Sequence, residues 1–87
     1  MAIIPHDEFY LKNGNVEVLC GNRLFRVHLT VLCLYSPAFR QIFVPDNLAP
    51  ESPNGCSRFL SSYAAMDFAT LLKLIYRSGY VTLPQHR

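Results

Sequence analysis

The sequence has few charges, no tryptophan, few cysteines and no long apolar run. Only 16% of its 87 residues are charged, with eight Lys and Arg against six Asp and Glu. The basic residues are scattered singly, without the cluster that would follow a phosphate backbone, so we expect no nucleic acid partner. No apolar run approaches the ~18 residues that a membrane helix needs, and the first residues lack the basic segment of a signal peptide. We therefore expect no membrane association.

The cysteine usage excludes a disulfide framework. Cys20, Cys33 and Cys56 are odd in number and widely spaced, and no Cys-x-x-Cys pair occurs. All three lie among apolar residues, so we interpret them as small buried hydrophobes in a reducing compartment. This predicts an intracellular protein, in the cytoplasm, the nucleus or both.

No set of residues is typical of catalysis or metal binding. His28 has apolar neighbours and no second ligand at metal-site spacing, so we interpret it as a structural histidine where a strand meets a helix. The hydroxyl residues form no Ser-His-acid arrangement in sequence order. We therefore expect no catalytic residue, no metal, no cofactor and no enzymatic activity.

Apolar residues are in excess, at 51% of the chain. A chain of this length forms one small domain, and so apolar a composition leaves some of that surface exposed. Either a partner covers this surface, or part of the fold is missing from the chain.

Residues 16–27 predict a β-hairpin. Apolar residues alternate in its first half, as on one face of a half-buried strand: Val16, Val18 and Cys20. Gly21 and Asn22 form a typical two-residue turn, and Phe25 belongs to the returning strand.

Two short helices are expected after His28. Val31, Leu32 and Tyr35 fall at helical spacing. Ser36 can cap a second helix with its hydroxyl, and Pro37 suits the first turn of that helix. Phe39 and Phe43 lie on the apolar stripe of the second helix, and we assign Tyr35, Phe39 and Phe43 to the core or to an interface.

A loop rich in Pro, Asn and Gly follows at 44–57, then a third strand at 56–61 and a longer helix at 64–77. The helix has apolar residues at i, i+3, i+4 and i+7: Phe68, Leu71, Leu72 and Ile75. Gly79 can supply the left-handed residue after the helix end. We expect Leu72 to be a core residue.

The chain divides into a lead-in at 1–13, a domain core at 14–83 and a tail at 84–87. In the lead-in, residues 9–11 form a short apolar cluster. This cluster could pack on the core as an extra edge strand or short helix, or contact a partner.

The run from Asn15 to His28 resembles the opening hairpin of BTB/POZ domains. Residues 29–43, with their Ser-Pro-Ala-Phe segment, are similar to the first two core helices of that family, and residues 68–80 to a later helix. The strand before that later helix looks most like fungal members. The resemblance implies an α/β (α+β) fold with a small three-stranded sheet and a flanking cluster of short helices. The residues we expect to be structural are Asn15, Gly21, Phe25, His28, Ser36, Pro37, Leu72 and Gly79.

The resemblance also implies a function. BTB/POZ domains are protein–protein interaction modules; many form dimers through their helical face, and many are adaptors that bind a cullin scaffold in ubiquitin ligases. Ala49 and Glu51 fall where such adaptors carry a hydrophobic-x-Glu contact, and with Tyr35, Phe39 and Phe43 they are the candidate interaction residues. The alternative is a shortened relic or fragment of a larger BTB protein without independent activity.

Overall fold

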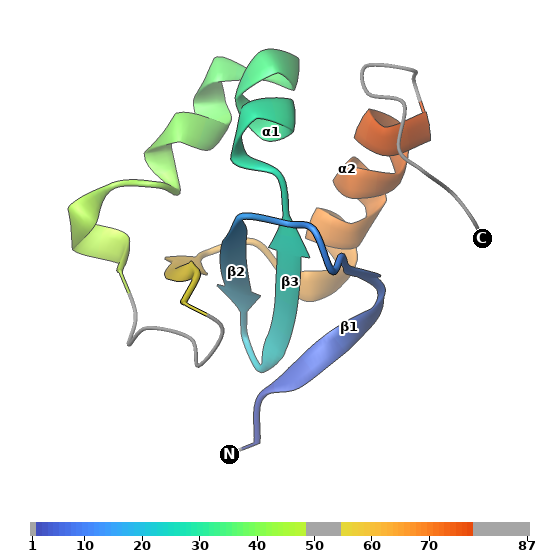
Figure 1. The fold of residues 1–87 in the computed structure, drawn as a ribbon, viewed down its shortest axis with the longest axis vertical. Helices are drawn as coiled ribbons and strands as arrows, with labels where there is room; N and C mark the ends of the chain where they lie inside the picture. The colour runs from blue at the N-terminus through green and yellow to red at the C-terminus, as the bar shows by residue number, and fades with distance from the viewer. Residues whose placement is uncertain (1, 49–54, 78–87) are drawn as a thin grey trace.

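The structure is a computed structural model that describes residues 2–48 and 55–77. The elements follow one another as β1 (Ile4–Tyr10), β2 (Val16–Cys20), β3 (Arg23–Val27), α1 (Leu29–Tyr35), the 3₁₀ helices η1 (Pro37–Gln41) and η2 (Pro45–Asn47), β4 (Ser57–Ser61) and α2 (Ala65–Arg77). In Figure 1, α1 lies above the β2–β3 hairpin, where β3 ends, and α2 lies to the right of α1. The mixed α+β fold predicted from the sequence is confirmed.

The sheet has four strands in the described part of the chain, in the order β1-β3-β2-β4, where the sequence predicted three. β2 and β3 are antiparallel, whereas β1 lies parallel to β3 and β4 parallel to β2. The additional strand is β1, so the lead-in packs on the core as an edge strand. Phe9 of β1 is buried among the core residues, and this burial helps to hold the strand on the domain.

The predicted hairpin is present with the expected turn. Gly21 has a positive φ of 62°, which is the left-handed conformation that glycine adopts at little steric cost. Val18 lies opposite Phe25 across the hairpin, and both side chains are fully buried. The alternation of the sequence therefore places one face of the hairpin in the core.

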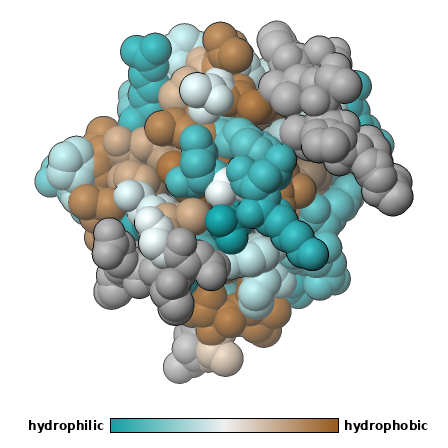
Figure 2. All heavy atoms as spheres, in the orientation of Figure 1, coloured by the Kyte–Doolittle hydropathy of each residue, from teal (hydrophilic) through white to brown (hydrophobic). Residues whose placement is uncertain are grey.

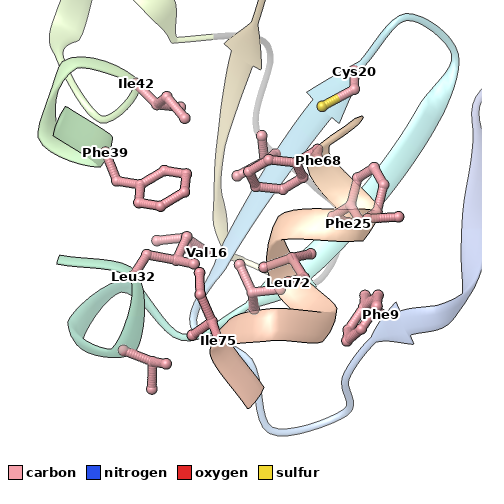
Figure 3. Close-up of a cluster of buried hydrophobic side chains, with 14 residues drawn as sticks. Phe9, Val16, Cys20, Phe25, Leu32, Phe39, Ile42, Phe68, Leu72 and Ile75 are labelled. Carbon is pink, nitrogen blue, oxygen red and sulfur yellow. The ribbon is translucent and has the colours of Figure 1, made fainter. Parts of the chain in front are cut away.

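The core lies between this face of the sheet and the helices (Figure 3). The buried cluster consists of Phe9, Val16, Val18, Cys20, Phe25, Val27, Val31, Leu32, Phe39, Ile42, Phe68, Ala69, Leu72 and Ile75. α2 supplies Phe68, Leu72 and Ile75, all three with no exposed surface. These residues share one helical face because they are three to four positions apart.

The second short helix expected from the sequence is present as a 3₁₀ helix, η1. The Ser36 hydroxyl accepts a hydrogen bond from the Ala38 N–H at 3.3 Å, and Pro37 occupies the first position. The Ser36 N–H also donates to the Leu32 carbonyl at 3.1 Å, so this residue ends α1 and begins η1. Gly79 and the predicted end of the core at residue 83 lie outside the described residues.

Leu72→Ala should lower the free energy of unfolding by about 2–5 kcal/mol, because it opens a cavity in a core that cannot fully relax. Leu60→Ala on β4 is the matched control; its side chain is 48% exposed and lies outside α1 and α2, and it should cost less than about 0.5 kcal/mol. Urea denaturation of both variants measures the difference. A loss for Leu72→Ala as small as that for Leu60→Ala would show that the buried face of α2 has been misassigned.

Candidate protein-interaction surface

Phe39, a candidate interaction residue, is part of the core. Its side chain is only 3% exposed, and its ring packs edge-on against Phe68 with centroids 6.2 Å apart. It therefore has almost no surface to offer a partner, because its short 3₁₀ helix turns the ring inward. Tyr35 and Phe43 are half-buried against the core, and the ring of Phe43 packs edge-on against Phe59 at 5.2 Å. Ala49 and Glu51 lie outside the described residues.

Asn15 and His28 come together where β3 meets α1. The Asn15 Oδ1 accepts the Leu29 N–H at 2.9 Å, which satisfies a free donor at the start of the helix. The backbone N–H of His28 donates to the Tyr76 hydroxyl at 3.2 Å, and the His28 Nδ1 lies 3.1 Å from the same oxygen. Burial lowers the pKa of His28, so its ring is neutral at pH 7. Tyr76 thereby connects the end of α2 to the start of α1.

The described residues include no cluster of metal-binding side chains and no disulfide. Within 2–48 and 55–77, no three His, Cys, Asp or Glu side chains lie close enough to hold a metal ion. The three cysteines are free, and burial raises the pKa of the Cys20 thiol to about 11. This thiol is protonated at neutral pH and is therefore a poor nucleophile.

Two leucines on the helices are among the exposed apolar side chains of α1 and α2, together with Met66 of α2, which is 80% exposed. Leu34 of α1 is 71% exposed, and Leu74 of α2 is 56% exposed. The two helices contact each other. Figure 1 shows them side by side. We call Leu34 and Leu74 with the outer surfaces of these helices the helical face. The helical periodicity that places Leu72 in the core places Leu74 on the opposite side of the helix. The structure adds how much of the Leu74 side chain is exposed.

A second candidate surface surrounds a cavity of about 220 Å³ beside β4, whose lining mixes polar and apolar side chains. Ile42, Asn47, Leu60 and Tyr63 are among its lining residues, and Leu48 is exposed nearby in the chain. Asn47 holds η2 against the end of η1, because its Nδ2 donates to the carbonyl oxygens of residues 41 and 42 at 2.9 and 3.2 Å. We call this surface the β4 groove. None of its exposed leucines was a candidate from the sequence, although the sequence predicted both the loop at 44–57 and the strand at 56–61.

The opposite face of the sheet contains a buried ion pair. Glu17 has no exposed surface, and its carboxylate lies 3.0 Å from the Arg58 Nε. The Tyr10 hydroxyl donates to the second carboxylate oxygen at 2.9 Å. These contacts join β1, β2 and β4. Figure 2 shows hydrophilic side chains near the centre of the face that it displays. Glu17 was not a candidate from the sequence, where the only sign of its role is an acidic residue between two apolar ones.

No described helix is long and apolar enough to span a membrane. The family model of the BTB/POZ domain matches residues 9–84, which is most of the 87-residue chain. No curated protein and no solved structure matches the chain.

Arg58→Met should lower the free energy of unfolding by about 3–5 kcal/mol, because it removes the bound guanidinium from a buried carboxylate. The double variant Glu17→Leu with Arg58→Met should recover most of this loss. Lys73→Met is the control, since the Lys73–Glu8 pair is exposed and 3.9 Å long, and it should change stability by less than about 1 kcal/mol. Chemical denaturation of the three variants tests this, and a double variant as unstable as Arg58→Met would contradict it.

Proposed function

The chain belongs to the BTB/POZ domain family, a family of protein-interaction modules, and we propose that it binds a second copy of itself through the helical face. The exposure of Leu34 and Leu74 on two helices that pack together carries this proposal. Exposed apolar side chains have an unfavourable free energy in water, and a partner that covers them removes this cost.

The free energy gained by burying these leucines, compared with the cost of association, indicates a reversible dimer. A two-fold interface buries each leucine twice, and complete burial of one such side chain contributes about 1.5–3 kcal/mol. Four leucines thus contribute about 6–12 kcal/mol at most, against an association cost of about 4–15 kcal/mol. We therefore expect a weak dimer, with contacts around the leucines deciding the final affinity.

We also propose an adaptor role, in which the β4 groove binds a cullin-type scaffold of a ubiquitin ligase. The exposed Leu48 and Leu60 beside the cavity support this role, because an apolar segment of a partner could be anchored there. Ala49 and Glu51 follow directly in the sequence and stay predicted contacts. An adaptor of this kind acts inside the cell, in the cytoplasm or the nucleus, and needs no catalytic residue of its own.

Sedimentation equilibrium over a wide concentration range tests the dimer. Leu34→Asp and Leu74→Asp should each weaken self-association by about 100-fold or more, because each change appears twice in a symmetric interface. Leu60→Asp is the matched control, an exposed leucine replaced on the β4 groove, and it should dimerise like the unchanged chain.

A monomer at every concentration would contradict the dimer and leave the adaptor role. Heterogeneous aggregation of the unchanged chain would instead favour a relic or fragment of a larger BTB protein.

A further inference from the structure

Strand β1 contains a bulge opposite the middle of β3. Pro5 lies opposite Leu24, and Tyr10 lies opposite Arg26. Five steps along β1 therefore correspond to two steps along β3, which leaves three extra residues on β1. Backbone N–H groups in such a bulge face no carbonyl of the neighbouring strand in register and need another acceptor.

His6 supplies that acceptor. Its Nδ1 accepts the N–H of Glu8 at 3.1 Å and the N–H of Phe9 at 3.2 Å. Its ring stacks on Phe25 of β3 with centroids 4.6 Å apart, and on Phe9 at 5.7 Å. One side chain thus closes the bulge and fastens it to the neighbouring strand.

This arrangement requires an unprotonated Nδ1. In a protonated imidazole both ring nitrogens are donors, so Nδ1 can accept neither hydrogen bond and points its own proton at two N–H groups. We propose that His6 is a pH-sensitive latch that holds β1 on the sheet while Nδ1 is unprotonated and releases the strand when the ring is protonated.

The charged groups around the ring leave this response intact. Burial lowers the pKa of His6 below its ordinary value of 6.5, and Arg23 on β3 and Lys73 on α2 lower it further. Asp7 and Glu8 on β1 itself act in the opposite direction and are outweighed. Since the released strand binds the proton more readily, the attachment of β1 is complete above pH 6.5 and weakens as the pH falls below it.

Solvent can reach the latch, and its opening changes the surface of the domain. His6 and Arg23 line a cavity of about 240 Å³ together with Ala65 and Met66 of α2. Release of β1 withdraws Phe9 from its stack on Tyr76, where the ring centroids are 6.0 Å apart, and frees the edge of β3. An open strand edge can pair with another extended segment, so acidification would create a new docking edge.

Amide hydrogen exchange of the full chain at about pH 7.5 and about pH 5, corrected for intrinsic exchange rates, tests the latch. Two hydrogen bonds report on β1: the Ile4 N–H donates to the Asn22 carbonyl at 2.8 Å, and the Leu11 N–H to the Arg26 carbonyl at 2.9 Å. Their protection should fall roughly 5- to 100-fold at the lower pH, the factor expected for the loss of two hydrogen bonds.

The Asn15 N–H, which donates to the Val27 carbonyl at 2.9 Å, is the internal reference and should keep its protection. A parallel loss at Asn15 would indicate global unfolding and overturn the proposal. Equal protection of Ile4 and Leu11 at both pH values would overturn it as well.

Two substitutions separate the acceptor from the ring. His6→Asn keeps an acceptor oxygen near the Nδ1 position without titrating, so the pH response of β1 should disappear. His6→Phe keeps the stacking and removes the acceptor, so β1 should be weakly protected at both pH values. His28→Asn removes another histidine with a lowered pKa and should leave the response unchanged. A pH response that survives in His6→Asn would contradict the latch.

If the His6 variants do not fold, the unchanged chain still gives a test. The amide shifts of Glu8 and Phe9 should titrate with the same midpoint as the His6 ring. Different midpoints would show that the ring and the bulge are not coupled.

Discussion

The ring of Phe68 connects the helices to the sheet, and the rest of the structure depends on its position. The ring packs edge-on against Phe25 of β3 at 4.9 Å and against Phe39 of η1 at 6.2 Å, and it stacks on Tyr63 at 5.8 Å. Phe68 has no exposed surface. Because aromatic pairs of this geometry add to the stabilisation from burial alone, Phe68 contributes strongly to holding α2 on the sheet, together with the buried Leu72 and Ile75. With α2 fixed, α1 can pack beside it and the helical face is formed.

The two faces of the sheet are closed by different physical means. Helices and apolar side chains cover one face, whereas on the other the buried carboxylate of Glu17 is held by Arg58 and Tyr10. A domain this small has one core, so a polar network in place of a second layer closes the remaining face. Strand β1 takes part in both arrangements, because Phe9 is buried in the core and Tyr10 lies on the polar face. His6 adds hydrogen bonds within the strand itself. Protonation of His6 would remove two of these polar contacts, which its Nδ1 accepts from Glu8 and Phe9.

The sequence predicted the elements that have a clear period. The alternation in 16–27, its Gly-Asn turn and the helical spacing of Phe68 and Leu72 were enough for the hairpin and α2. The fold class came from the resemblance to BTB/POZ domains, and the family match agrees. β1 stayed one of several alternatives because its bulge interrupts the alternation and its burial comes from distant residues. Glu17 was missed because its partner Arg58 is 41 residues away. The surface was the hardest to predict, since an apolar stripe that contains Phe39 is compatible with core or interface until its burial is known.

The central claim is that the helical face binds a second copy of the chain. Isotope-filtered NOE measurements on a mixture of labelled and unlabelled chain observe that contact directly, because only protons on different copies give a signal. The account predicts intermolecular signals at the methyl groups of Leu34 and Leu74 and none at Leu60. Signals confined to Leu60 and the β4 groove would contradict it. The absence of any intermolecular signal at chain concentrations well above those used for sedimentation equilibrium would also contradict it.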